Sequence, residues 1–394
     1  MNPGWTRARR FLAVRTDNLG DVLMTSPALR ALKAHAPDAH VTLLTSPSGA
    51  AAARHCDAVD DIIVYAAPWT RHPATGLASA VGQEAQAIAE DHALIHGLSA
   101  QRFDAAVVFT VCTQSPLPAA LVCRLAGIPL RLAHCRENPY DLLTDWVPDR
   151  ESVEAGMRHE VERQLALVAA VGLRPEEDGL RFRVSAADRD GARSQLAAAG
   201  VDPDLPFLVV HPGASAASRR YTAERFGEAA DAIANATGWQ LVFTGGTDEA
   251  ALVARAMAGM RARAVSLAGR LATGELGALI AKAGLLLANN TGPAHIAAAV
   301  GTPVVVLYAL TNPQHTPWRV PSRVLSHDVP CRYCLRSTCP QGHHECLLAI
   351  PASQVVAAAL DLIEETNRSN AAASRGMPPT PAILRTVLPA QVVQ

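Results

Sequence analysis

Short apolar runs alternate with amphipathic stretches along most of this 394-residue chain. The apolar runs fit buried strands, and the stretches between them carry apolar residues at helical spacing. Strands that alternate with helices form parallel sheets, so the pattern predicts an α/β fold with doubly wound, mostly parallel sheets. In the first half, the expected strands are 11–15, 41–45, 62–65 and 105–109, and the expected helices are 21–36, 74–98, 118–126 and 151–171.

The second half restarts the same alternation after two segments rich in Pro and Asp, 172–179 and 201–206. Such segments punctuate a chain, so we expect the domain boundary in this zone, near residues 175–205. The sequence thus predicts two Rossmann-like domains, 1–200 and 201–366, and a poorly ordered Ala-, Ser- and Pro-rich tail over 367–394. In the second half, the expected strands are 207–210, 240–243, 265–267, 285–288 and 304–307, and the expected helices are 223–236, 249–260, 274–283, 294–300 and 351–365.

Composition argues against a nucleic-acid partner. Charged residues make up 18% of the chain, the net charge is −1 and aromatic residues make up 4%, so neither bulk positive charge nor stacking platforms are available. No stretch approaches the ~18 apolar residues of a membrane span. The apolar run after Arg7, Arg9 and Arg10 is too short for a signal peptide, so we expect a cytoplasmic protein. Contact of these arginines with an anionic membrane surface remains open.

The segment 285–310 combines a buried strand, a polar loop and a helix. Asn290 or Thr291 fits the N-cap, Gly292 allows a ligand close to the backbone, and Pro293 fits the first helical position. A helix N-terminus at the carboxyl edge of a sheet suits a phosphate, although the segment also fits a plain capped turn. His295, one turn further on, is compatible with either interpretation.

Two more loops are expected at the same edge. After strand 207–210 come Ser215 and Arg219, and an arginine fork pairs well with a diphosphate. After strand 240–243 come Gly245 and Gly246, and then Glu249, which suits ribose hydroxyls. Solvated loops and helix capping are the plainer alternatives, and for Asp248 in the third loop capping is favoured. Taken together, the three loops predict a holder for a nucleoside diphosphate.

The first domain places Asp21 in the first turn of a helix, just past a strand. The helix dipole stabilises a carboxylate there by about 0.3–1 kcal/mol and keeps it ionised. Asp21 is therefore either a capping residue or a general base that accepts the proton of an acceptor hydroxyl. Asn18 and Gly20, in the loop before it, bring the backbone close to whatever binds there.

Three segments together, "RTDNLGDVLMTSPALRALKAHAPDAHVTLL", "HPGASAASRRYTAERF" and "NNTGPAHIAAAVGTPVVVLY", resemble family 9 glycosyltransferases, the ADP-heptose:lipopolysaccharide heptosyltransferases. The resemblance covers roughly residues 10–360. It implies a GT-B fold, in which two Rossmann-like domains face a central cleft, the first binds the acceptor and the second binds the nucleotide-sugar. It also implies an inverting transfer without a catalytic metal or other cofactor, onto a lipid-linked lipopolysaccharide core at the inner membrane surface.

Position by position, the resemblance makes Asp21 the catalytic base. It places Thr291, Gly292 and His295 at the donor phosphates, and Ser215 and Arg219 in the loop that contacts the diphosphate. Two departures concern the donor: the family usually has a lysine at Arg219 and often an aspartate at Asn290, thought to engage the heptose. Another ADP- or UDP-sugar is therefore an alternative donor.

Other classes of protein fit less well. A nicotinamide-dependent dehydrogenase needs a G-x-G-x-x-G loop after a first strand, which neither domain supplies. A sugar-nucleotide epimerase on the same two-domain scaffold remains an alternative. A two-domain solute-binding protein would need an export signal, and none is visible.

Eight cysteines fall into two groups. Cys56, Cys112, Cys123 and Cys135 are scattered, which is typical of buried thiols. The second group is bunched and consists of Cys331, Cys334, Cys339 and Cys346. Its spacing fits a structural zinc, although the paired C-x-x-C layout of zinc ribbons is missing and a loop of free thiols is the alternative.

Overall fold

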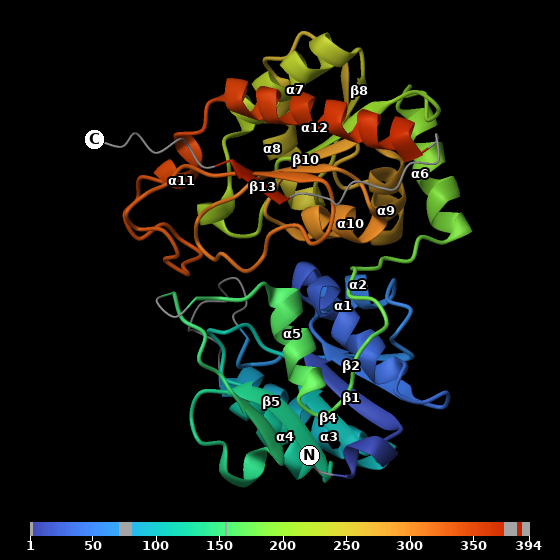
Figure 1. Ribbon diagram of the computed structural model, residues 1–394, viewed down its shortest axis with the longest axis vertical. Helices are drawn as coiled ribbons and strands as arrows, with labels where there is room; N and C mark the ends of the chain where they lie inside the picture. Colours follow the sequence, from blue (N-terminus) through green and yellow to red (C-terminus); the bar gives the residue numbers. More distant parts are fainter. Residues whose placement is uncertain (1–2, 71–80, 154–155, 374–383, 388–394) are drawn as a thin grey trace. The chain divides into compact units, whose positions relative to one another are not determined.

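The computed structural model describes residues 3–70, 81–153, 156–373 and 384–387. The chain divides into two compact units, Met1–Asp178 and Gly179–Gln394. Each unit is built on its own parallel sheet with helices on both faces (Figure 1). The predicted α/β class is therefore confirmed, and with it the division into two Rossmann-like domains.

The first unit has a six-stranded sheet in the order β3-β2-β1-β4-β5-β6. Strand β1 lies at its centre, and the chain runs outward from β1 to β3, then returns to β4 on the other side of β1. The carboxyl ends of β1 and β4 therefore flank the switch point, where ligands of such sheets bind. The strands are β1 (Arg10–Arg15), β2 (His40–Thr45), β3 (Asp61–Val64), β4 (Ala105–Val108), β5 (Leu130–Cys135) and β6 (Asp145–Pro148).

Two layers of helices cover this sheet. On one face α1 packs against α2 and α5, and on the other α3 packs against α4. Buried apolar side chains from β1, β4, α3 and α4 form the core on the second face. The helices are α1 (Leu19–Lys33), α2 (Pro47–Ala53), α3 (Val81–Gln101), α4 (Leu117–Leu125) and α5 (Glu160–Ala169), with short 3-10 turns η1 (Trp5–Arg7) and η2 (Tyr140–Leu142).

The second unit has a seven-stranded sheet in the order β13-β12-β11-β10-β7-β8-β9. Strands β7 and β10 are neighbours at its switch point, and β8 lies next to β7. The loops after β7, β8 and β10 therefore leave adjacent strands at one edge. The strands are β7 (Phe207–His211), β8 (Gln240–Phe243), β9 (Ala264–Ser266), β10 (Leu285–Asn289), β11 (Val304–Leu307), β12 (Ser322–Leu325) and β13 (Leu384–Val387).

Helix α7 packs between α8 and α12 on one face of this sheet, and α9 packs between α6 and α10 on the other. The side chains of α7, α8 and α12 join those of the central strands in one large apolar core. The helices are α6 (Ala186–Ala198), α7 (Ala223–Thr237), α8 (Ala250–Met257), α9 (Thr273–Lys282), α10 (Gly292–Val300), α11 (Glu345–Leu348) and α12 (Ala352–Ala373), with 3-10 turns η3 (Ala217–Arg219) and η4 (Thr247–Glu249).

The division between the units lies inside the predicted zone but earlier than the predicted residue 200. Helix α6 belongs to the second unit because it packs on α9. Phe182, just before α6, lies so close to Gly277 that a Cβ there would stand 2.3 Å from its ring. The segment between Asp178 and Val201 thus belongs to the second unit and is not the end of the first unit.

Two expectations about helices and the tail need correction. The helix predicted over 151–171 is α5 alone, since Glu151 lies outside any helix and its carboxylate pairs with Arg158 at 2.6 Å. The tail predicted over 367–394 is helical as far as Ala373, where α12 ends, and 384–387 form strand β13 beside β12. The remainder of that tail, and positions 74–80 of the predicted helix 74–98, lie outside the described residues.

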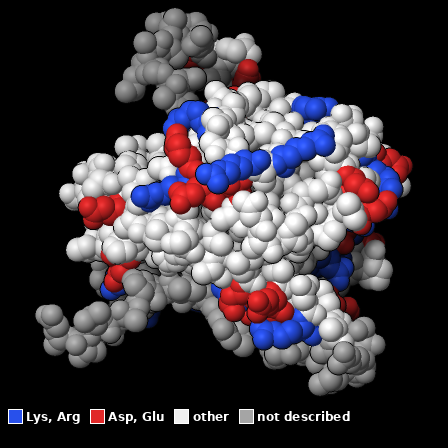
Figure 2. Space-filling model, turned by 90° about the horizontal axis from the view of Figure 1, so that it is seen from above, with Lys and Arg blue, Asp and Glu red and all other residues white. Residues whose placement is uncertain are grey.

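Among the described residues, no helix is both long and apolar enough to cross a bilayer. On the face drawn in Figure 2, acidic and basic side chains are interspersed and most of the surface is uncharged. Of the N-terminal arginines, Arg9 pairs with Asp38 at 2.9 Å and Arg10 donates to the Gln101 carbonyl. Two of the three arginines considered for contact with a membrane surface therefore already have partners within the protein.

Candidate active site

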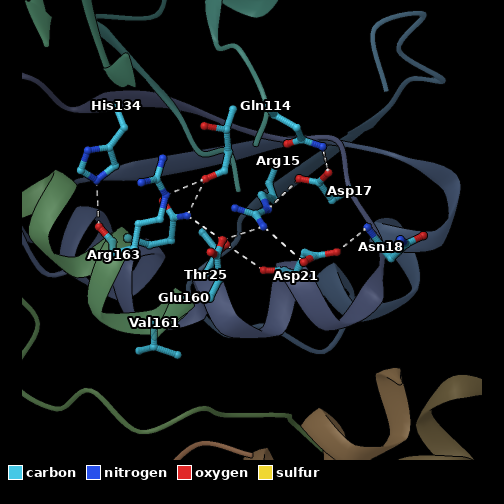
Figure 3. A network of polar contacts seen from close by, with 12 residues as sticks. Arg15, Asp17, Asn18, Asp21, Thr25, Gln114, His134, Glu160, Val161 and Arg163 are labelled. Carbon is cyan, nitrogen blue, oxygen red and sulfur yellow. Dashed lines mark hydrogen bonds and ion pairs between the residues drawn. The ribbon is translucent and has the colours of Figure 1, made fainter. Parts of the chain in front are cut away.

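The carboxyl end of β1 carries a buried ionic cluster (Figure 3). The guanidinium of Arg15, with no exposed side-chain surface, lies 2.9 Å from Asp17 Oδ2, 3.3 Å from Asp21 Oδ1 and 2.8 Å from Glu160 Oε1. One cation thus faces three carboxylates. Burial raises the pKa of Asp17 to about 6 against the opposing charge of Arg15, and the negative charges of Asp21 and Glu160 add to the rise.

The two carboxylate oxygens of Asp21, in the first turn of α1, have different partners. Oδ2 accepts the Asn18 backbone N–H at 3.1 Å, and Oδ1 faces Arg15. The side chain keeps 15% of its surface exposed, whereas Arg15 and Glu160 have none. Asp21 therefore does cap the helix, as the plainer interpretation held, and it is also the one carboxylate on Arg15 with appreciable access to solvent.

Helix α5 supplies the polar face that closes this cluster. Glu160, Arg163 and Gln164 are completely buried, although all three are polar. Gln164 Nε2 donates to Glu160 Oε1 at 2.7 Å and to the Thr110 carbonyl at 3.0 Å, and so links α5 to the loop after β4. From the same loop, Gln114 donates to Asp17. The two loops that flank the switch point are thus tied together.

Arg163 fixes α5 to the end of β6. Its two terminal nitrogens each lie 3.0 Å from an oxygen of Asp149, in a paired geometry. Burial alone would raise the pKa of Asp149, but its hydrogen bonds to Arg163 and the charge of that residue outweigh burial and lower the pKa. His134, on β5, bonds to the Arg163 carbonyl at 3.0 Å, and burial beside Arg163 lowers the pKa of His134 to about 4.

In the second unit, Glu249 joins the loops after β7 and β8. Its Oε2 accepts the Gly246 N–H at 2.8 Å and lies 3.7 Å from Nε2 of His211. A Cβ on Gly213 would stand 2.0 Å from the Glu249 carboxylate, so a larger residue there would displace this carboxylate from its position. Burial lowers the pKa of His211, although Glu249 opposes the shift, and Nδ1 contacts Thr244 Oγ1 at 3.0 Å.

The capping role that the sequence favoured for Asp248 belongs instead to Glu249. The Gly246 amide is held by the Glu249 carboxylate, and Asp248 is exposed within η4. Gly246 is exposed as well, and Gly245 is half-buried. Gly245 and Gly246 therefore leave backbone atoms of this loop accessible at the surface.

The loop after β10 is tied to the loop after β7 by Asn289. Its Oδ1 accepts the Tyr221 N–H at 3.1 Å, and its Nδ2 donates to the Pro212 carbonyl at 2.8 Å. Helix α10 begins at Gly292 with Thr291 as its N-cap, but the Thr291 hydroxyl makes no capping bond. It donates to the Asn289 carbonyl at 3.4 Å instead. The start of α10 thus has no side-chain cap from Thr291.

Arg219 and Asn290 approach the same side chain, Tyr308. Burial raises the pKa of Tyr308, while the charge of Arg219 and a hydrogen bond with Asn290 act in the opposite direction. Arg219 is half-buried, and its Nε has no hydrogen-bond partner among the described residues. Its neighbour Arg220 donates to the Ala214 carbonyl at 2.7 Å and braces the loop. An incompletely satisfied guanidinium at the carboxyl edge suits an anion.

The structure therefore brings most of the predicted donor-site residues to one edge of the second sheet. Asn290, Pro293 and His295 are buried, Thr291 and Gly292 are half-buried, and Ser215 is exposed on its loop. In the first unit, Asn18 is exposed and Gly20 is buried beside Asp21. Their roles toward ligands stay predictions.

The bunched cysteines lie in the segment between β12 and α12. All four are partly exposed, and Cys331 Sγ lies 3.5 Å from His343 Nε2. Within the described part of the chain, no three His, Cys, Asp or Glu side chains are arranged to hold a metal ion. Zinc binding stays a prediction from spacing. The four scattered cysteines are buried, as expected.

This arrangement, two Rossmann-like units with functional loops at their switch points, defines the fold class. The solved "E. coli ADP-heptose lps heptosyltransferase II" matches with a TM-score of 0.70 at 22% sequence identity, over 91% of this chain and 99% of that chain. The likeness identifies the GT-B fold of glycosyltransferases.

Sequence comparison identifies the family. The model of glycosyltransferase family 9 (heptosyltransferase) matches residues 92–344, and the chain belongs to this family of enzymes. "Lipopolysaccharide heptosyltransferase 3" of Escherichia coli is 27% identical over 308 residues, 76% of this chain and 83% of the relative. "Lipopolysaccharide heptosyltransferase 2" of Escherichia coli K12 is 25% identical over 365 residues, 88% of this chain and 96% of the relative. The protein is thus a glycosyltransferase.

Sequence reasoning missed the partners of the predicted residues. Arg15 and Asp17 were visible as charges at the end of an apolar strand, a pattern that should have indicated a buried ion pair. Nothing marked Glu160, which reaches Arg15 across 145 positions of sequence. Asn289 and Tyr308 were not marked either, because their contacts depend on strand order.

Proposed function

We propose that this chain transfers heptose from ADP-heptose to a lipopolysaccharide core acceptor, with inversion at the anomeric carbon. Membership of family 9 and the names of its relatives support the donor and the acceptor class. The single observation that carries the mechanism is the placement of Asp21. It is a partly exposed carboxylate with both oxygens held, at the switch point of the first sheet.

In this mechanism, Asp21 accepts the proton of the acceptor hydroxyl as the hydroxyl oxygen attacks the anomeric carbon of the donor. The new glycosidic bond forms while the bond to the diphosphate breaks, and ADP leaves on the opposite face of the sugar. A positioned general base contributes roughly 10²–10⁴-fold to such a step. Contacts with Arg15 and the Asn18 amide hold the carboxylate in one orientation.

The second unit holds the donor in this proposal. The diphosphate lies at the N-terminus of α10, near Thr291 and Gly292, where backbone amides and the helix dipole favour an anion. Arg219 and Ser215 contact it from the loop after β7. Glu249, with Gly245 and Gly246, lies on the ribose side, and the buried Asn290 faces the sugar. Charge neutralisation of the departing ADP needs no metal here, because arginine and the helix supply it.

The acceptor is proposed to be a lipid-linked glycan at the cytoplasmic surface of the inner membrane. The enzyme would act there as a peripheral protein. The membrane side of the proposal rests on the chemistry of a lipid-anchored substrate. Flotation with anionic vesicles, with and without the acceptor, tests it.

Release of ADP from ADP-heptose in the presence of heptose-deficient core acceptor tests the activity. We expect acceptor-dependent release, and thermal stabilisation by ADP exceeding that by UDP or GDP. Stabilisation by UDP alone would reassign the donor, in keeping with Asn290 in place of the family's aspartate. Incubation with the nucleotide-sugar alone gives the control: an epimerised sugar without acceptor would identify an epimerase.

A further inference from the structure

We propose that Glu160 is a positioning residue for Asp21, acting through Arg15, so that a fully buried carboxylate on α5 sets the orientation and basicity of the catalytic base. This inference rests on the proposed function, because it takes Asp21 to be the base. Glu160 lies 139 positions after Asp21, on helix α5, which packs against α1. The guanidinium of Arg15 lies between them and contacts both carboxylates (Figure 3).

The geometry singles out one nitrogen of Arg15. The same Nη2 atom lies 2.8 Å from Glu160 Oε1 and 3.3 Å from Asp21 Oδ1. The Nε atom faces Asp17 Oδ2 at 2.9 Å. Nη2 has only two protons. The shorter contact with Glu160 uses one of them, and this fixes the direction of the other proton, which points at Asp21. Glu160 therefore determines where the guanidinium points and, with it, where Asp21 is held.

Glu160 cannot reach a substrate itself. Its side chain has no exposed surface, and Gln164 donates to the same Oε1 atom. Gln164 also holds the Thr110 carbonyl, so the position of Glu160 is set by both α5 and the loop after β4. Thr25 in turn donates to the Asp21 carbonyl at 2.8 Å and holds the first turn of α1. The pair Arg15–Glu160 is thus a rigid support behind an accessible carboxylate.

The charges explain why a second anion is useful there. A lone arginine beside Asp21 would stabilise the carboxylate and weaken it as a proton acceptor. Glu160 offsets part of that positive charge and restores the proton affinity of Asp21. The same effect acts at Asp17, whose pKa is raised by burial and by the negative charges of Asp21 and Glu160.

The excess of negative charge around Arg15 makes the inference testable. Three carboxylates around one buried guanidinium carry more negative charge than the arginine neutralises, and buried charge without full compensation is destabilising. Replacing Glu160 with its neutral isostere should therefore leave the fold intact and its melting temperature unchanged or higher. A side chain kept only for stability would give the opposite result.

The experiment compares Glu160→Gln with Glu162→Gln, which changes an exposed carboxylate in the first turn of the same helix. We expect Glu160→Gln to lower the single-turnover rate by roughly tenfold or more, because the base is weaker and less well held. The KM for the donor and the thermal shift with ADP should match those of the parent protein, and Glu162→Gln should behave as the parent in every measurement.

Each other outcome decides the matter. A parental turnover rate in Glu160→Gln, or a loss that appears only as a raised donor KM, overturns the inference. So does a chain that no longer folds, since it would assign Glu160 to stability. Arg15→Lys keeps the charge but cannot make the same fork, and should lower turnover without affecting ADP binding. If Asp21→Asn retains full turnover, the proposed base itself fails, which is a distinct result.

Discussion

Arg15 and Asp21 form an ion pair of 3.3 Å in which the arginine is completely buried and the aspartate reaches the surface. The pair joins the last residue of β1 to the first turn of α1. The aspartate is therefore oriented without being hidden, which is what a general base requires. The same feature separates Asp21 from Asp17 and Glu160, which share the arginine but are buried.

The donor diphosphate should depend on Arg219. Its Nε has no hydrogen-bond partner among the described residues, and its positive charge acts to lower the pKa of Tyr308. Arg219→Ala should weaken ADP binding by roughly tenfold or more, since a charge-assisted bond to phosphate is lost. Arg219→Lys should keep most of the affinity. Calorimetric titration with ADP measures both, and Arg255→Ala, at an exposed pair on α8, is the control. Equal affinities in all three variants would exclude Arg219 from the donor site.

The buried pair Arg163–Asp149 should be a major determinant of stability. Removing one partner leaves the other charge buried, so Arg163→Met should lower the free energy of unfolding of the first unit by about 3–5 kcal/mol. The pair Arg255–Glu224 has a similar separation, 2.7 Å, but is solvent-exposed. Its loss in Arg255→Ala should cost less than about 1 kcal/mol. Denaturant titrations of both variants compare the two environments, and similar losses would contradict the assigned burial.

His134 should make the first unit sensitive to acid. Its pKa is about 4 in the folded protein and about 6.5 in the unfolded chain, so the unfolded state takes up the proton first. Its contribution to stability is complete above pH 6.5 and is lost as the pH falls toward 4, by about 3 kcal/mol in total.

The variant His134→Gln keeps a donor for the Arg163 carbonyl and removes this titration. The free energy of unfolding of the parent protein should therefore fall relative to that of the variant as the pH is lowered from 7 to 4.5. Denaturant titrations at several pH values measure it. A difference that stays constant over this range would show that His134 does not carry the buried neutral imidazole described.

The spacing of Cys331, Cys334, Cys339 and Cys346 leaves a metal prediction to be tested. A chain that holds structural zinc will contain about one equivalent after purification without chelator, and the double variant Cys331→Ser, Cys334→Ser will lose it. Elemental analysis of both proteins decides. A content near zero in the parent protein rejects zinc and leaves a loop of free thiols.

The fold was accessible from sequence where the pattern was regular. Strands such as 285–288 and 304–307 are continuous apolar runs, and β10 and β11 lie there. Strands β5 and β6 were not predicted. Strand β5 contains Arg131 and His134, which are not typical of a buried strand. The structure explains them: Arg131 donates to the carbonyls of Ile128 and Leu142, so its charge is satisfied inside the turn.

The site was accessible only where local sequence encodes it. Gly-rich loops and helix starts reveal Gly245, Thr291 and Gly292, because their chemistry is that of the backbone. The cluster on Arg15 depends on the packing of α5 against α1, and no local pattern records which residue of α5 will face the arginine. A fully buried, polar stretch at Glu160 and Gln164 resembles a solvated helix face until its neighbours are known.

The most direct measurement is single-turnover transfer by Asp21→Asn, with ADP affinity determined on the same preparation. The substitution keeps the size of the side chain and removes its proton affinity. Our account predicts that transfer falls by roughly 10²-fold or more while ADP binding and folding stay as in the parent protein. Turnover within a few-fold of the parent would contradict the role of Asp21 as the base.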